Sequence, residues 1–195
     1  MSALSFTQCA LRWLLLSVSL ATVAGMDGLR AEIPSTTPSA TPSPAAPPQP
    51  FSVSGWRSQR PSGTDVTFFI CEDTKCGPGS KVSYRLYAPD TTMTIEQFRA
   101  SQEQTVKILD QRVPGQTTTI LGVEGDKGTN LPRVFRARRL KVAADGSREY
   151  QVSGMLFGLK ASASLISTAG GEASSTTNFA LFAIPVLAML GLPPR

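Results

Sequence analysis

The hydrophobic and polar positions between residues 64 and 87 follow the two-residue period of β-strands. Residues 81–87, KVSYRLY, alternate apolar and polar side chains, and residues 64–71, TDVTFFIC, are rich in β-branched and aromatic types. Both patterns are typical of half-buried strands. The segment between them, EDTKCGPGS, is dense in turn-forming residues. We therefore expect the two strands to pair as a hairpin.

A longer period, close to that of an α-helix, follows in residues 94–110. Thr94, with Gln97 three positions later, has the form of a capping box, which marks the first turn of a helix. Pro114 and Gly115 end the segment. The apolar residues that share one stripe, and so predict a helix with one buried face, are Ile95, Phe98, Val106 and Leu109.

The pattern beyond this helix predicts several strands joined by short connections. The expected strands are residues 117–123, 133–142, 148–159 and 161–167. Residues 144–147, ADGS, predict a hairpin turn, because Asp-Gly tolerates the positive φ angles of tight turns. Residues 124–130, EGDKGTN, are too polar and glycine-rich for a strand and predict a loop.

A final apolar segment predicts a second helix. Ser174 and Ser175 are its expected caps, and Pro185 is expected to bend or delay it. The apolar-rich stretch is about 14 residues long, which favours a buried core helix over a membrane span. Its principal apolar residues are Phe179, Phe182, Val186, Met189 and Leu190.

The order of elements is hairpin, helix, antiparallel strands and terminal helix, which predicts an α+β domain with an antiparallel sheet covered by helices. This arrangement resembles the PsbP-like family, an α/β/α sandwich. The segments that carry the resemblance are residues 94–111 (TIEQFRASQEQTVKILDQ), 117–125 (TTTILGVEG) and 174–190 (SSTTNFALFAIPVLAML).

The resemblance implies an adaptor or accessory protein, and it brings no catalytic residues with it. A second resemblance implies a different fold. Gly55-Trp56-Arg57 ahead of a cysteine-containing hairpin is similar to the invasion-associated locus B family, an exported all-β domain. The helix predicted over residues 94–110 argues against this alternative.

The N-terminal residues 1–31 have the form of a signal peptide. Arg12 is the only charged residue ahead of an apolar run over residues 13–24, which has the length of a signal core. Cleavage is expected after Gly25 or Ala31, since small residues precede both positions. The alternative is an uncleaved membrane anchor.

Residues 32–50 predict a disordered linker, because they contain seven prolines among Ser, Thr and Ala and cannot bury apolar surface. A single globular domain is then expected over residues 51–192. Removal of residues 1–31 takes away Arg12, Arg30 and Asp27 from 19 basic and 14 acidic residues, which leaves a net charge of +4. That charge favours anionic surfaces weakly and is too low for a nucleic-acid-binding protein.

The two cysteines left after processing, Cys71 and Cys76, predict a disulfide in an oxidising compartment. Cys9 precedes the apolar run of the signal, so a lipidated cysteine is not expected. A redox-active or metal-binding pair is the alternative. The C-x4-C spacing and the absence of histidine from the sequence argue against it.

The absence of histidine also excludes Ser-His-Asp triads, Cys-His dyads and histidine metal clusters. A hydrolase using two carboxylates remains the alternative function, with Glu72-Asp73 or Glu124-Asp126 as candidates. Residues 125–130 lack the spacing of a phosphate-binding P-loop and have too few acids for a calcium site. We therefore predict no catalytic residue, no cofactor and no metal site.

The densest basic segment of the chain is expected on a single strand. Its alternation places Arg136 and Arg138 on one face and the other three residues on the opposite face. One interpretation is a solvated outer face whose charges discourage aggregation. The other is a partner-binding surface formed by Arg133, Arg136, Arg138, Arg139 and Lys141.

These observations predict an exported, non-enzymatic envelope protein, periplasmic or secreted, that acts as a binding or accessory module. The expected partner is a protein or an anionic envelope surface and not a nucleic acid. No integral membrane domain is expected once the signal peptide is removed.

Overall fold

The computed structural model describes residues 51–77, 79–90 and 92–191. They belong to one compact unit of the chain, residues 44–195. The predicted signal peptide and the predicted linker lie outside the described residues.

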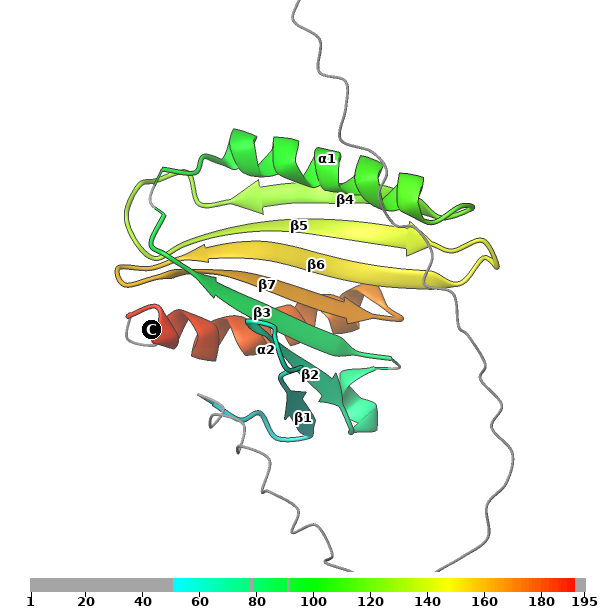
Figure 1. The fold of residues 1–195 in the computed structure, drawn as a ribbon, viewed down its shortest axis with the longest axis horizontal. Coiled ribbons are helices and arrows are strands. Elements are labelled where there is room, and N and C mark those ends of the chain that lie inside the picture. The colour runs from blue at the N-terminus through cyan, green and yellow to red at the C-terminus, as the bar shows by residue number, and fades with distance from the viewer. Residues whose placement is uncertain (1–50, 78, 91, 192–195) are drawn as a thin grey trace, which may run out of the picture. The chain divides into compact units, whose positions relative to one another are not determined.

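Seven strands form one antiparallel sheet with the order β1-β2-β3-β7-β6-β5-β4 (Figure 1). Within the described residues, two α-helices and a short 3-10 helix accompany the sheet, which confirms the predicted antiparallel sheet with helices. The elements are β1 Trp56–Gln59, β2 Val66–Cys71, η1 Thr74–Cys76, β3 Lys81–Tyr87, α1 Ile95–Arg112, β4 Thr117–Gly125, β5 Arg133–Val142, β6 Arg148–Phe157, β7 Ser162–Ala169 and α2 Glu172–Met189.

The first turn of α1 has the capping box that the sequence predicts. The Gln97 backbone N–H donates to Thr94 Oγ1 over 3.2 Å, and the Thr94 backbone N–H donates to Gln97 Oε1 over 2.8 Å. These two bonds satisfy backbone donors that a helix leaves without partners at its start. Thr94 therefore fixes where α1 begins, and the chain is held in place where it approaches the sheet.

The two long helices pack on opposite faces of the sheet. On β6, Leu156 belongs to the core cluster that contains Phe182 of α2, whereas its neighbour Phe157 belongs to the cluster that contains Phe98 of α1. Successive residues of a strand point to opposite faces, so the two clusters lie on either side of the sheet. Helix α1 lies along β4 and β5, and α2 crosses β7, β6 and β3 (Figure 1). This is the layered arrangement of an α/β/α sandwich.

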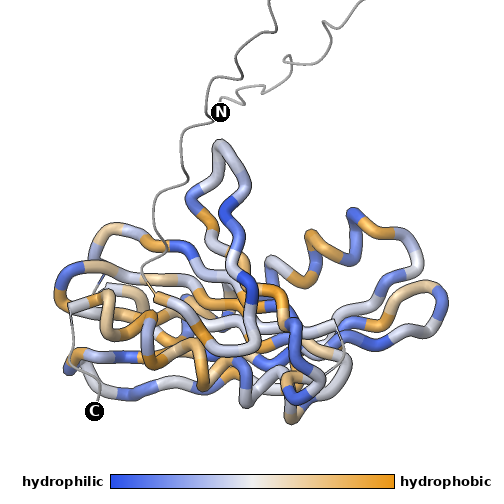
Figure 2. The backbone as a smooth tube through the Cα atoms, turned by 90° about the horizontal axis from the view of Figure 1, so that it is seen from below, coloured by the Kyte–Doolittle hydropathy of each residue, from blue (hydrophilic) through white to orange (hydrophobic). Residues whose placement is uncertain are grey.

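Close packing of α2 depends on a glycine in the middle of β6. A Cβ atom on Gly154 would lie 2.5 Å from Cζ of Phe179, inside normal contact distance. The absence of a side chain lets the ring of Phe179 approach the strand backbone. Figure 2 shows that short hydrophobic and hydrophilic segments alternate along the described backbone.

Several boundaries differ from those the sequence predicts. Strand β1 was not predicted, because its four residues, WRSQ, are too short and polar to give a periodic signal. Helix α2 begins at Glu172 with Gly171 at the N-cap position, so the prediction of Ser174 and Ser175 as caps is wrong. Ser175 Oγ instead donates to the carbonyl oxygen of Ser167 over 3.1 Å, which ties α2 to β7.

The all-β alternative is also wrong, because α1 and α2 are each 18 residues long. Pro185 lies inside α2 and does not delay its start. Among the described residues, no helix combines the length and the apolar content needed to cross a membrane.

Candidate functional site

The basic residues of β5 divide between the two faces of the sheet. Arg136 and Arg138 point to the α2 side, and their side chains are 42% and 40% exposed. Arg133 and Arg139 point to the α1 side, where they are only 5% and 3% exposed. The two-residue period of the strand predicts this division, but it does not predict the burial. The structure therefore does not bring these residues together in a single strip.

The exposed basic residues of β5 are held in ion pairs. Arg136 Nε lies 2.9 Å from Glu124 Oε1, and Arg138 Nη1 lies 2.6 Å from Glu172 Oε1. On the α1 side, Lys141 Nζ lies 2.7 Å from an oxygen of Glu149. Exposed pairs of this kind add little to stability. Their consequence here is that positive charge on β5 is balanced locally.

The outer face of α2 is unusually apolar for a surface helix. Its sequence, EASSTTNFALFAIPVLAM, has no charged residue after Glu172. Leu181 and Ile184 are 44% and 58% exposed. A groove of about 590 Å³ runs between α2 and the β4–β5 pair, and it is lined by Glu124, Gly125, Asp126, Val134, Arg136, Phe179, Ala180, Ala183 and Ile184. The sequence indicated this surface through the missing charges of α2, which we interpreted only as a sign of burial.

On the other side of the sheet, a cavity lies at each end of α1. The one at the N-terminal end has a volume of about 510 Å³ and is lined by α1, the segment before it and the loop after β4. Arg133 reaches this cavity, and its guanidinium carbon lies 5.4 Å and 4.9 Å from the ring centres of Phe135 and Phe157. Its Nη1 donates to the carbonyl oxygen of Met93 over 3.3 Å. Aromatic rings and a backbone acceptor thus hold this buried cation.

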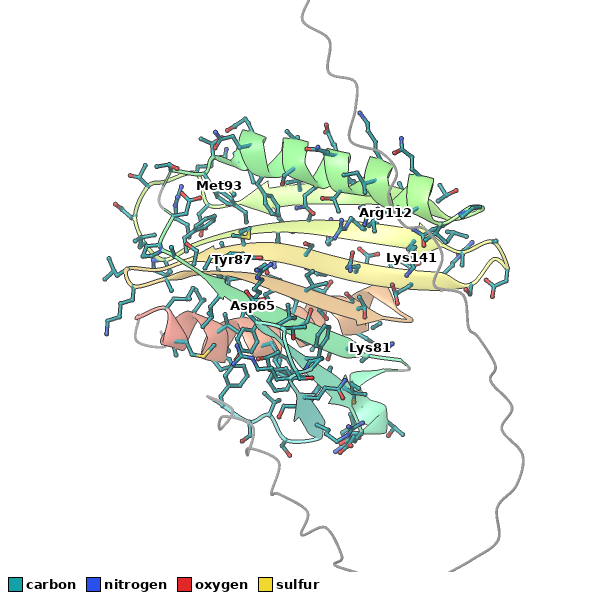
Figure 3. The ribbon with its side chains drawn as sticks, in the orientation of Figure 1. Asp65, Lys81, Tyr87, Met93, Arg112 and Lys141 are labelled. Carbon is teal, nitrogen blue, oxygen red and sulfur yellow. A yellow bond between two sulfur atoms is a disulfide. The ribbon has the colours of Figure 1, made fainter. Side chains whose placement is uncertain are left out.

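The cavity at the C-terminal end of α1 has a volume of about 280 Å³. Its lining comes from the end of α1 and from β4, β5 and β6, and consists of Leu109, Val113, Gln116, Thr118, Arg139, Lys141, Glu149 and Gln151. Figure 3 labels Arg112, the last residue of α1, and Lys141 on β5, which mark this end of the molecule. Met93, also labelled there, marks the N-terminal end.

Arg139 is the exceptional residue of the smaller cavity. Among the described residues, no group forms a hydrogen bond with its buried Nε or Nη1 atoms. Burial in this setting lowers the pKa of Arg139 from its ordinary value, because desolvation penalises the charged form. The nearby Thr118 hydroxyl donates to Asp110 Oδ1 over 2.6 Å, so the pKa of Asp110 is lowered and that carboxylate is already engaged.

The carboxylates proposed for a hydrolase are each engaged in local structure. Glu72 accepts from Arg57 Nε over 2.7 Å, and Asp73 accepts from the Lys75 backbone N–H at the start of η1. Glu124 pairs with Arg136 as described above. Asp126 accepts from the backbone N–H of Val134 over 2.9 Å. Each of the four acids therefore already accepts a hydrogen bond or forms an ion pair.

Cys71 and Cys76 form the predicted disulfide between the end of β2 and η1. The turn it closes is also tied to α2, a contact the sequence analysis missed. Asn178 Nδ2 donates to the carbonyl oxygen of Cys76 over 3.0 Å and to Ser80 Oγ over 3.1 Å. Asn178 is 3% exposed. The sequence signal for this contact was a polar residue directly before the apolar half of α2.

Comparison with known proteins supports the fold. No family model and no curated protein matches the sequence. Among solved structures, the chain is similar to cyanobacterial PsbP (CyanoP) from Synechocystis sp. PCC 6803, with a TM-score of 0.50 and 11% sequence identity. The match covers 68% of this chain and 79% of that one. The fold is therefore PsbP-like, as the resemblance of the sequence predicts.

Proposed function

We propose that this protein is an exported, non-enzymatic accessory module that binds a protein partner along the outer face of α2. The observation that carries this proposal is the apolar outer face of that helix, with Leu181 and Ile184 exposed beside a groove of about 590 Å³. A surface helix normally presents charged residues to water, and a contiguous exposed apolar patch is typical of an interaction site.

The rim of the groove specifies the chemistry of the partner. Arg136 and Arg138 lie beside α2, but Glu124 and Glu172 already balance their charge. A partner would gain little from a broadly acidic surface at this position. We expect an apolar helix or strand that covers Ile184, with polar residues at its edge, as in other protein interfaces. In this proposal Arg136 and Arg138 orient the partner and contribute less to its affinity.

Photo-crosslinking of the protein in cells tests the interface. A photoreactive residue at position 180, which is exposed on α2, should link to one partner from the cell envelope. Ile184→Asp should abolish that link, because a carboxylate would be buried at the interface. Ile108→Asp is the matched control, since Ile108 is 39% exposed on α1, on the other side of the sheet.

Equal loss of the crosslink in both variants, or in neither, would contradict the proposed surface. A crosslink to a second copy of the chain would identify a homodimer interface and would overturn the hetero-partner proposal. Export is tested separately by cell fractionation and N-terminal sequencing. We expect the extracytoplasmic protein to begin within residues 26–32, and an intact Met1 in the cytoplasm would contradict export.

A further inference from the structure

We propose that the cavity beneath the C-terminal end of α1 binds a monovalent carboxylate, with the guanidinium of Arg139 as its anchor. This site lies on the opposite face of the sheet from the proposed partner surface and is independent of it. Three features carry the inference, namely the state of Arg139, the balance of charge around it and the lining of the cavity.

Arg139 offers donors that the protein does not use. It is 3% exposed, and its Nε and Nη1 atoms have no hydrogen-bond partner within the part of the chain that the structure describes. A buried cation without acceptors is costly, so such a group normally has a partner. The fork of donors on a guanidinium matches the two oxygens of a carboxylate, which can accept two parallel hydrogen bonds. A carboxylate at one edge of the guanidinium would accept from Nη2 and from either Nε or Nη1, and would therefore give one of these two atoms an acceptor.

The charges around the cavity favour a single negative charge on the ligand. Lys141 also lines the cavity, but its charge is balanced by Glu149 at 2.7 Å. Arg139 is then the one cation of the lining without a counter-charge. A phosphate dianion would bring two charges to one cation and would lie near the Glu149 carboxylate. Like charges in a partly desolvated site repel, so a monovalent anion fits better.

The rest of the lining favours a ligand with a short apolar portion. Leu109, in the last turn of α1, and Val113, the residue that caps its C-terminus, give the cavity an apolar portion. The volume of about 280 Å³ lies at the small end of ligand-binding cavities. A short-chain carboxylic acid has both features. The carboxylate and apolar side chain at the C-terminus of a peptide have the same chemistry.

Binding is measured by NMR and by thermal unfolding of the purified protein with four probes and one amide control. Sodium hexanoate should shift the Arg139 Nε–H signal and raise the melting temperature, while 1-hexanol and inorganic phosphate should do neither. The fourth probe is N-acetyl-Gly-Leu, compared with its C-terminal amide. Tighter binding of this acid than of hexanoate would identify a peptide C-terminus as the source of the carboxylate, and weaker binding would identify a free acid.

Two variants test whether Arg139 is the anchor. Arg139→Met should weaken hexanoate binding by about tenfold or more, because it removes the charged donors but keeps the length of the side chain. Arg112→Met, at an exposed position outside the lining, should bind hexanoate as the original protein does. Ile184→Asp should also leave hexanoate binding intact, which separates this site from the partner surface.

The proposal is overturned if 1-hexanol stabilises the protein as much as hexanoate does, or if phosphate binds more tightly than hexanoate. It is also overturned if Arg139→Met retains full hexanoate affinity. If that variant does not fold, the Arg139 Nε–H signal of the original protein decides the question. An unchanged signal at saturating hexanoate would contradict a contact with the guanidinium.

Discussion

Arg133 and Arg139 lie on the same face of β5 and are buried beneath opposite ends of α1, but their surroundings differ. Arg133 lies against the rings of Phe135 and Phe157 and donates to the carbonyl oxygen of Met93. Arg139 has two buried donor atoms without a partner among the described residues. Core groups hold the first arginine, and the second is the one that we propose binds a carboxylate. Burial alone therefore does not distinguish the two residues, whereas the groups that contact each guanidinium do.

The largest expected effect comes from removing the aromatic support of Arg133. Phe157 is fully buried, packs 5.1 Å from the ring centre of Phe135 and lies under the Arg133 guanidinium. Phe157→Ala should lower the free energy of unfolding by about 3–5 kcal/mol, because it leaves a cavity and removes a cation–π contact. Chemical denaturation measures this change. A decrease of less than about 1 kcal/mol in the free energy of unfolding would mean that the Phe157 ring contributes little to the stability of the N-terminal end of α1.

The next prediction is a gain in stability, and it concerns Arg139 at the C-terminal end of α1. Arg139→Met should raise the free energy of unfolding by about 1–3 kcal/mol in the absence of ligand, because it removes buried donors that lack partners. Denaturation of the ligand-free protein measures this. If the variant is instead destabilised, Arg139 has a stabilising partner in the free protein, and the contrast between the two arginines disappears.

Arg133→Met sharpens the comparison, since it makes the same substitution on the same strand face. We expect it to lower the free energy of unfolding by about 1–2 kcal/mol, as the contact with two rings and a charged hydrogen bond is lost. The two Arg→Met variants, studied together by denaturation, should therefore change stability in opposite directions. If both variants changed the free energy of unfolding in the same direction, burial alone would determine the effect of the substitution.

The smallest expected effect concerns two aspartates, one near each end of α1. A hydrogen bond from the backbone N–H of Thr92 is the main cause of the lowered pKa of Asp90. A hydrogen bond from the hydroxyl of Thr118 is the main cause of the lowered pKa of Asp110. Because each pKa is lower in the folded state, each carboxylate contributes stability above its unfolded pKa, and that contribution is lost as the pH falls through the folded value. Asp90→Asn and Asp110→Asn should each reduce the fall in melting temperature between about pH 5 and about pH 2 by roughly 1–3 °C. An unchanged acid response would contradict these assignments.

The sequence predicted α1 with its first turn, because local signals determine both. A capping box uses residues three positions apart, and a helical stripe repeats within the same segment, so Thr94, Gln97 and Phe98 could be recognised without a fold. The stripe nevertheless missed Gln102, which is polar but only 8% exposed beneath the helix. The predicted start of α2 was wrong for a related reason. Ser174 and Ser175 resemble caps locally, but Ser175 bonds to β7 instead.

The order of elements and the alternation of β5 are properties of the sequence itself, because both depend on neighbours along the chain. The pairing of β3 with β7, and of Asn178 with the disulfide turn, joins residues far apart in sequence, and only the tertiary structure decides such contacts. The same holds for the two arginines. Their spacing placed them on one face of a strand, but α1 decided how each would be buried. Its two ends bring different groups to the sheet, so Arg133 acquires two aromatic rings and a backbone acceptor, whereas Arg139 keeps two buried donor atoms without a partner among the described residues.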